Sequence, residues 1–501
     1  MQKNILSDFA VTFFLQIAVA GIGVVVLKIL AMNLSEEGLG AYLVGKRVIS
    51  FLAPLVTINL SMSLARFVSL DETKGFEYFS ISFAFVTIIF LFIIAAIIFL
   101  SRPLASLLFD NTELNFLIFP LVCLLYATAL TQLCSGYFRG KREFLKMNLI
   151  DLVYWIVAIG SLILLFIRPE DNFSFLKNYF ILFASVSVIW NIYFIYNMSK
   201  DNGKNKFSFR WLRFDQYKTD FGRFIRYGMN RLPQGLMMAG IFFIPVFIAS
   251  KSFSLSVAAY IGIMISIISV LQILVYPFNL IFVPKFSFYQ SQMQGDEIKK
   301  YSQLILEFCL TLPFLAGIFV FFLTREMILI WFGDLYEIVI DYFLFVGPLL
   351  GFYLSFVLIR GILDGLYDKP YVNYITLIAF SGTSLIALLS AWFRWELGGL
   401  TAAISIGMVA LGTASVGILI KKQKLKLINL KNILSVLWLF GVGYLLFYLD
   451  HWIGQHSVYF DLIIKSSVLI LLFIISIALY LFLRYEWIDE LINRVKTLKQ
   501  F

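Results

Sequence analysis

Fourteen long runs of mainly apolar residues follow one another along the 501-residue chain. Nearly all of them have the length of about 17 to 25 residues that an α-helix needs to cross the hydrocarbon core of a bilayer, and the eighth is longer, with a bend expected at Pro277. The runs cover residues 9–32, 39–64, 79–100, 114–136, 148–167, 175–197, 229–249, 254–283, 302–323, 341–363, 371–392, 398–420, 433–449 and 462–483. Inside lipid only helices and closed barrels satisfy every backbone hydrogen bond. The pattern therefore predicts an all-α polytopic membrane protein.

The composition argues against a soluble enzyme. Hydrophobic residues make up 61% of the chain and charged residues 14%, whereas soluble domains have about 45–50% and about 25%. The sequence has no nucleotide-binding Walker motif and no large loop with paired carboxylates or a Ser/Cys–His arrangement. Its three cysteines lie inside apolar runs and its two histidines share one loop, a spacing that fits no metal site. We expect a protein that is not an enzyme, with no cofactor and no metal.

The net charge of +10 is explained mainly by orientation in the membrane. With the N-terminus in the cytoplasm, the even-numbered loops and both termini contain 30 of the 40 Lys and Arg residues, and the odd-numbered loops contain six. Basic residues are enriched on the cytoplasmic side of membrane proteins. The bias predicts an even number of helices in a bacterial inner membrane with both termini in the cytoplasm. It does not indicate a nucleic acid as partner.

Short identities recur between the two halves of the chain. Ala-Gly-Ile at residues 20–22 recurs at 239–241, and Asn-Leu at 59–60 recurs at 279–280. The offset drifts slowly from 218 to 225 residues, which predicts two six-helix lobes related by pseudo-two-fold symmetry, with a cleft between them. The expected domains are an N-terminal lobe at 1–198, a basic cytoplasmic linker at 199–228, a C-terminal lobe at 229–420, and helices 13 and 14 with a cytoplasmic tail at 421–501.

Polar residues inside or bordering the apolar runs are the candidates for a substrate pathway, because charged groups at membrane depth usually face a water-filled cavity. Asn59, Ser63 and Arg66 have the spacing of one helix face. A cavity with positive walls favours an anionic substrate. The candidate lumen residues are Lys28, Arg47, Asn59, Arg66, Arg231, Gln234, Gln272 and Asn279.

Each of these candidates has a simpler alternative. The amides can tie neighbouring helices together, and Lys28 can extend to the membrane interface. For Lys465, near the outer end of the last run, extension to the interface is the preferred interpretation. Asp151 and Glu307 lie near inner helix ends, where each is either an interfacial residue or a site for a coupling proton or cation.

Three segments resemble a known group of transporters. They are Leu-Ser-Glu-Glu-Gly-Leu-Gly-Ala-Tyr at 34–42, Leu-Ala-Arg-Phe at 64–67 and Arg-Gly-Lys-Arg at 139–142. With the size, the fourteen helices and the repeat, the chain resembles the polysaccharide transporters, the Wzx-type O-antigen flippases of the multidrug/oligosaccharidyl-lipid/polysaccharide (MOP) exporter superfamily. The family places cations in helices 1, 2, 7 and 8. Lys28, Arg47, Arg66 and Arg231 match this placement in helices 1, 2 and 7, whereas helix 8 departs from it, with amides and no charge before Lys285.

The resemblance implies a function in surface polysaccharide or lipopolysaccharide biosynthesis. A flippase of this kind moves an undecaprenyl-pyrophosphate-linked oligosaccharide from the cytoplasmic to the periplasmic leaflet by alternating access through a cationic cleft. The partners implied are the lipid-linked oligosaccharide, the bilayer, a polysaccharide polymerase and a chain-length regulator. Two alternatives remain: a MATE-like antiporter of drug or metabolite cations, and a membrane polysaccharide polymerase or ligase.

Overall fold

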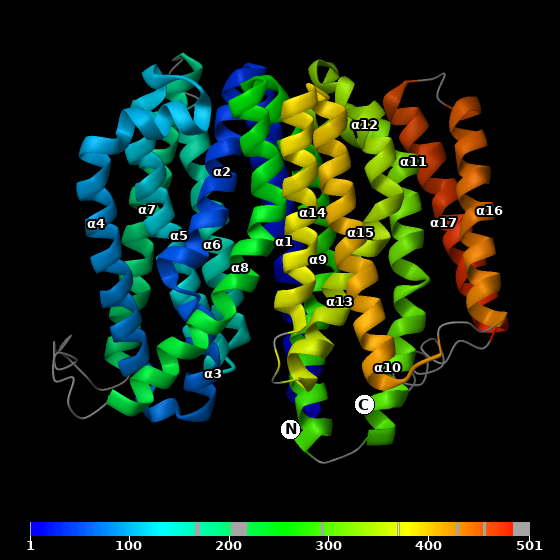
Figure 1. Ribbon diagram of the computed structural model, residues 1–501, viewed down its shortest axis with the longest axis horizontal. Helices are drawn as coiled ribbons and strands as arrows, with labels where there is room; N and C mark the ends of the chain where they lie inside the picture. Colours follow the sequence, from blue (N-terminus) through cyan, green and yellow to red (C-terminus); the bar gives the residue numbers. More distant parts are fainter. Residues whose placement is uncertain are drawn as a thin grey trace. The chain divides into compact units, whose positions relative to one another are not determined.

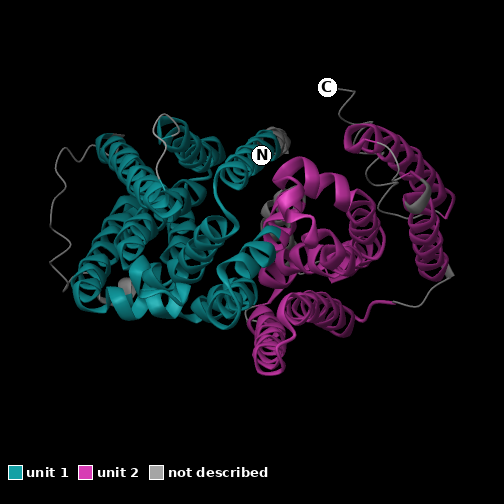
Figure 2. Cartoon of the chain, turned by 90° about the horizontal axis from the view of Figure 1, so that it is seen from above, with its two compact units in different colours: residues 1–263 teal, residues 264–501 magenta. Residues whose placement is uncertain are grey.

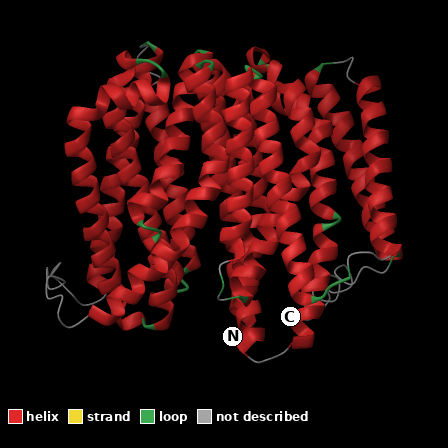
Figure 3. Ribbon diagram, viewed as in Figure 1, coloured by secondary structure: helices red, strands yellow, loops and turns green. Residues whose placement is uncertain are grey.

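The structure is a computed structural model that describes residues 2–165, 171–201, 218–291, 295–367, 369, 371–426, 430–453 and 457–483. Throughout these residues the regular secondary structure is helical and the connections are short (Figure 3). Fourteen segments of the described chain are long and apolar enough to cross a membrane. The expected class, an all-α polytopic membrane protein with about fourteen spans, is confirmed.

The chain forms two compact units, residues Met1–Ile263 and Met264–Phe501 (Figure 2). The boundary falls inside a helix, α9. The first unit contains α1 (Gln2–Asn33), α2 (Glu36–Thr57), α3 (Leu60–Leu70), η1 (Glu72–Lys74), α4 (Gly75–Phe109), η2 (Thr112–Leu117), α5 (Ile118–Gly140), α6 (Phe144–Leu165), α7 (Asn172–Asp201), α8 (Lys218–Ser252) and the beginning of α9 (Leu255–Ser291).

The second unit contains the rest of α9 and the elements that follow. They are α10 (Gly295–Cys309), α11 (Leu312–Phe332), η5 (Asp334–Tyr336), α12 (Ile338–Val346), η6 (Gly347–Leu349), α13 (Leu350–Leu366), α14 (Tyr371–Phe393), α15 (Glu396–Gln423), α16 (Leu430–Ile453) and α17 (Val458–Phe482) (Figure 1). The division expected from the repeat, with lobes at 1–198 and 229–420, is a different partition and stays a prediction. Residues 202–217 of its linker lie outside the described residues.

The second apolar run does not form the uninterrupted helix expected over 39–64. Helix α2 ends at Thr57, and α3 begins at Leu60 and continues past the expected end to Leu70 (Figure 1). Ile58 and Asn59 between them have φ angles of 44° and 54°. This left-handed conformation is tolerated by asparagine but is strained for a β-branched residue such as isoleucine. Pro54, one turn earlier, has no backbone N–H to continue the helical hydrogen bonds.

Glycines on two neighbouring helices allow their backbones to contact the backbone of α3 and of the break before it. A Cβ added at Gly136 of α5 would lie 2.5 Å from the carbonyl oxygen of Ser61, and one added at Gly228 of α8 would lie 2.6 Å from that of Ile58. Small residues permit this close approach of membrane helices. Because α5 and α8 both need a glycine to reach this region, the break between α2 and α3 is fixed by packing against other helices.

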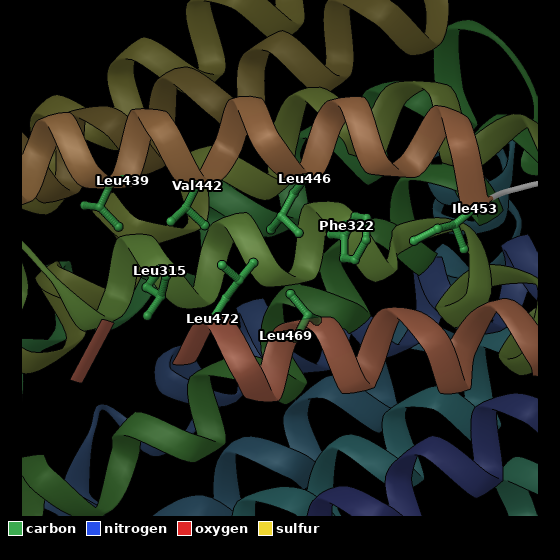
Figure 4. Packing of buried hydrophobic residues seen from close by; sticks show 8 residues of the cluster. All are labelled: Leu315, Phe322, Leu439, Val442, Leu446, Ile453, Leu469 and Leu472. Atoms are coloured by element: carbon green, nitrogen blue, oxygen red, sulfur yellow. The ribbon is translucent and has the colours of Figure 1, made fainter. Parts of the chain in front are cut away.

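In the second unit, α16 and α17 both pack against α11. The side chains of Leu439, Val442 and Leu446 on α16, and of Leu469 and Leu472 on α17, point toward α11 (Figure 4). They enclose Leu315 and Phe322 of α11 in one buried apolar cluster. The two C-terminal helices are therefore joined to the second unit through α11.

A buried lysine lies within this interface. The ammonium of Lys465 on α17 forms an ion pair of 2.8 Å with Glu326 of α11 and a second ion pair with Asp450 of α16. It also donates a hydrogen bond of 3.2 Å to the backbone carbonyl of Phe322. Lys465 and Glu326 are both 0% exposed. The expectation that Lys465 extends to the membrane–water interface is wrong, because its ammonium is buried and is bound by Glu326, by the carbonyl of Phe322 and by the partly exposed Asp450.

A third ion pair lies one turn away on the same face of α17. Arg325 of α11 contacts Asp461 of α17 at 3.4 Å, and the carboxylate of Asp461 is fully buried. Asp461 and Lys465 are four residues apart, so they share a helix face. Helix α11 thus presents two consecutive charged residues, Arg325 and Glu326, to two residues of opposite charge on α17.

Candidate functional site

Two of the candidate arginines meet on a single aromatic ring in the first unit. The guanidinium carbon of Arg66 on α3 lies over the ring of Tyr227 on α8, 4.6 Å from its centroid. That of Arg231 lies 5.0 Å from the centroid of the same ring. Tyr227 and Arg231 are four residues apart on one face of α8. The structure therefore brings Arg66 and Arg231, 165 positions apart in the sequence, into one cationic cluster.

The backbone of α8 is joined to the break in the second span. The side-chain amide of Asn59 donates a hydrogen bond of 3.1 Å to the backbone carbonyl of Arg231. A Cβ at Gly228 would lie 2.9 Å from the hydroxyl of Ser63. Asn59, Ser63 and Arg66, which the sequence places on one helix face, therefore all contact α8. We call Arg66, Tyr227 and Arg231 the arginine–tyrosine site.

The arginine–tyrosine site lies where the first unit is rich in positive charge. Arg223 and Arg226 are exposed on the first described turns of α8, within one turn before Tyr227. Arg66 is exposed and Arg231 is half-buried. Among the described residues, no carboxylate pairs with Arg66, so its charge is not neutralised within the part of the chain that the structure describes. An anion is the ligand that this arrangement attracts.

Lys46 and Arg47 occupy different surroundings on α2. The ammonium of Lys46 lies 5.5 Å from the ring centroid of Trp155 on α6. Arg47 is 8% exposed and interacts electrostatically with the buried Tyr42. Arg47 is twelve residues from Asn59, about 18 Å along a helix. We therefore do not include it in the arginine–tyrosine site, and its predicted place in the lumen stays a prediction.

The other lumen candidates are dispersed. Lys28 on α1 is half-buried, and Gln234 on α8 is 3% exposed. Gln272 of α9 lies in the second unit, where its side-chain oxygen accepts a hydrogen bond of 2.7 Å from the hydroxyl of Tyr353 on α13. This contact has the form of an amide that ties two helices together. The side chain of Asn279 lies outside the described residues.

Asp151 ends a chain of polar side chains between α1 and α6. Its carboxylate accepts a hydrogen bond from the side chain of Gln16, and Arg139 is close enough to interact with it electrostatically. The Gln16 amide in turn donates to the Asn148 side chain at 3.0 Å, and Asn148 donates to the Thr12 hydroxyl at 3.0 Å. Asn148 is completely buried. The coupling role expected for Asp151 stays a prediction.

Glu307 of α10 is 6% exposed in the second unit. Its carboxylate is 3.5 Å from the side-chain nitrogen of Gln303, one turn earlier. Among the described residues, no group of three or more His, Cys, Asp and Glu side chains is placed to hold a metal ion. A coupling role for Glu307 stays a prediction.

Tyr227, which contacts two candidate cations, and Trp155, which contacts Lys46, were not predicted from the sequence. A partial signal was available for Tyr227, since Arg223, Tyr227 and Arg231 recur every four residues and so lie close to one face of a helix. No signal was available for Trp155, because its contact with Lys46 joins helices that are not adjacent in the sequence.

The amide of Asn59 offers a test of the break in the second span. Asn59→Gly keeps the left-handed backbone without strain but removes the hydrogen bond to α8, which is worth about 1 kcal/mol. Asn59→Ala loses the same bond and adds about 1–2 kcal/mol of backbone strain. In detergent we expect the melting temperature to fall in both variants, and further in Asn59→Ala. Asn33→Ala, which removes an exposed amide at the end of α1, is the control; equal melting of all four proteins would contradict the interpretation.

No protein-family model and no curated protein matches the chain. Solved structures of transporters do match it. The lipid II flippase MurJ in an inward closed conformation superimposes with a TM-score of 0.70 at 15% identity, over 94% of this chain and 98% of that one. The eukaryotic MATE transporter AtDTX14 matches with a TM-score of 0.60 at 17% identity, over 84% of this chain and 97% of that one.

A multidrug resistance MATE family transporter of the MOP superfamily, in an inward-facing conformation, matches in the same way. Its TM-score is 0.60 at 14% identity, over 83% of this chain and 98% of that one. Identities this low establish a common fold and not a common substrate. The chain is a multi-pass membrane protein with the fold of MurJ and of the MATE transporters.

Proposed function

We propose that the protein is a flippase that moves a polyprenyl-pyrophosphate-linked oligosaccharide, such as an O-antigen unit, across the inner membrane of a bacterium. The observation that carries the proposal is the arginine–tyrosine site, in which Arg66 and Arg231 meet on one ring. Arginine binds phosphate oxygens through pairs of parallel N–H donors. A site with two arginines fits a pyrophosphate, which presents several such oxygens.

The number of helices supports a flippase over a MATE-like antiporter. The match to MurJ extends over about a tenth more of the chain than the match to AtDTX14. That difference is close to the combined length of α16 and α17, which have 24 and 25 residues. The sequence likewise resembles a fourteen-helix flippase, whereas the antiporters have twelve helices.

Orientation and partners follow as further parts of the proposal. The distribution of Lys and Arg supports a cytoplasmic position for both termini and for the N-terminal part of α8. The arginine–tyrosine site then lies at the side where a lipid-linked oligosaccharide is assembled before it is flipped. A polysaccharide polymerase and a chain-length regulator would act on the product at the opposite face.

A cation-coupled antiporter is the second candidate, and the buried polar chain that ends at Asp151 favours it. The same chain fits a flippase that uses an ion gradient, since rocking of two lobes can be driven by a proton or cation bound in one of them. Asp151 is thus proposed as the coupling residue in either function.

Transport in liposomes tests the proposal. The full chain is reconstituted with undecaprenyl pyrophosphate bearing a fluorescent oligosaccharide, and a membrane-impermeant quencher reports the fraction exposed on each leaflet. We expect protein-dependent flipping, with Asp151→Asn removing its dependence on an imposed ion gradient. Export of a fluorescent organic cation without flipping of the lipid would instead identify an antiporter.

A further inference from the structure

The arginine–tyrosine site contains a residue that carries no charge and yet contacts both of its cations. We propose that Tyr227 is a positioning residue, whose ring holds the guanidiniums of Arg66 and Arg231 in place for the pyrophosphate of the substrate. This inference rests on the proposed function, and it assigns a role to a residue that no motif in the sequence marks.

The ring of Tyr227 contacts an aromatic cluster through Phe67. Phe67 of α3 lies edge-on to it, with ring centroids 6.2 Å apart. Phe67 also lies edge-on to Phe224 of α8 at 5.5 Å, and Phe224 stacks on Tyr78 of α4 at 5.1 Å. Phe224 is completely buried. Four aromatic rings from α3, α4 and α8 thus form one cluster, in which Tyr227 lies next to the cations and packs against Phe67 in the absence of a ligand.

Two like charges on one ring need compensation, because neighbouring guanidiniums repel each other. The negative face of an aromatic ring supplies it, with about 0.5–1 kcal/mol for an exposed cation and about 2 kcal/mol for a desolvated one. Distances of 4.6 Å and 5.0 Å place both Arg66 and Arg231 within the range of this interaction. Tyr227 therefore lowers the cost of keeping the two arginines together in the absence of ligand.

An aromatic ring and a carboxylate both attract an arginine, but only the ring leaves the N–H donors of the guanidinium available to a ligand. A carboxylate accepts the N–H donors of arginine in pairs, and an anionic ligand must then displace it. A ring attracts the charge without occupying those in-plane donors. Among the described residues no carboxylate pairs with Arg66, so this arginine is positioned by the ring but not neutralised. Positioning of a binding group before the ligand arrives is the form of preorganisation that raises affinity.

The test measures binding of undecaprenyl pyrophosphate, which has the pyrophosphate but no sugar, to the full chain in nanodiscs. We expect Tyr227→Phe to bind as the wild type does, since the ring is kept. Tyr227→Leu should bind about tenfold more weakly, with a larger effect on affinity than on melting temperature. Tyr196→Leu, a change at an exposed tyrosine of α7, is the control.

If Tyr227→Leu folds poorly, its loss of binding cannot be assigned to the missing ring. Fluorinated phenylalanines at position 227 then provide a second test, because they keep the ring and its packing. Each added fluorine weakens the negative face of the ring while the size stays nearly constant, so affinity should fall stepwise from Phe to its trifluoro derivative. If the wild type binds and this series is flat, the role of Tyr227 is overturned while the proposed function stands. If the wild type does not bind the lipid pyrophosphate, the proposed function and this inference are both overturned.

Discussion

Reversing the charge of Arg66 or Arg231 is expected to abolish flipping while the protein is still inserted in the membrane. Each substitution, Arg66→Glu or Arg231→Glu, replaces an attraction to the pyrophosphate by a repulsion beside the remaining arginine. With an effective dielectric constant near 20, opposite charges 4 Å apart attract by about 4 kcal/mol. The rate of flipping should therefore fall by at least about 100-fold, which corresponds to about 3 kcal/mol.

Three further variants make this result specific. Arg66→Lys keeps the charge but loses the paired donors of the guanidinium, so we expect an intermediate loss. Lys299→Glu, at an exposed position of α10, has the same change of net charge and should flip normally. Arg47 is a poorer choice for charge reversal, since it is 8% exposed and a buried glutamate there would disturb folding. Normal surface polysaccharide in cells that express only Arg66→Glu or Arg231→Glu would remove both residues from the pathway.

Replacing Lys465 by methionine is expected to destabilise the protein more than either substitution of Asn59. The change leaves the carboxylate of Glu326, which is 0% exposed, without its cation. Breaking a buried ion pair in this way costs about 3–5 kcal/mol. If Lys465 extended to the interface, the same substitution would cost about 1 kcal/mol or less. Thermal unfolding of the detergent-solubilised protein distinguishes the two cases.

Removal of both charges should restore much of the lost stability. The double variant Lys465→Met, Glu326→Leu has no buried carboxylate at position 326. A well-packed apolar pair is often as stable as the buried ion pair it replaces. Asp450 remains 42% exposed at its side chain and can be hydrated. Melting of the single variant at the wild-type temperature would show that Lys465 is not buried as described.

A second expected consequence concerns the two C-terminal helices. The ion pairs of Lys465 with Glu326 and of Asp461 with Arg325 join α17 to α11 within a layer of apolar contacts. Charged groups at this depth have few alternative partners, which fixes the register of α17 along α11. Lys465→Met should therefore weaken the contact of α17 with α11. Limited proteolysis tests this prediction, and we expect faster cleavage after α16 in the variant.

Much of the fold was predictable because a membrane helix is a local property of the sequence. A run of apolar residues about 20 long has one favourable structure in lipid, and it needs no distant partner to adopt it. The fourteen spans follow from this rule alone. The break at Ile58 and Asn59 does not, because the only local signal is Pro54, and the conformation depends on the glycines of α5 and α8 that pack against it.

The candidate site was predictable in part. Arg66, Arg231 and Asn59 were identified because polar residues are rare at membrane depth and conspicuous when present. Their meeting on Tyr227 was not predictable, since the spacing along α8 places Tyr227 near the face of Arg231 but says nothing of Arg66 on another helix. The prediction for Lys465 failed for a related reason: its partners lie on α11 and α16, and proximity to a helix end suggested the interface.

The sequence by itself determined the class of molecule, the number of spans and which residues are out of place in a bilayer, because the energy of transfer into lipid is summed residue by residue along one helix. Only the tertiary structure decided which of those residues meet. Whether a lysine extends to water or binds Glu326, and whether two arginines repel or share one ring, depends on groups that other helices bring within about 5 Å, because electrostatic interactions between charged groups become strong only at such short distances.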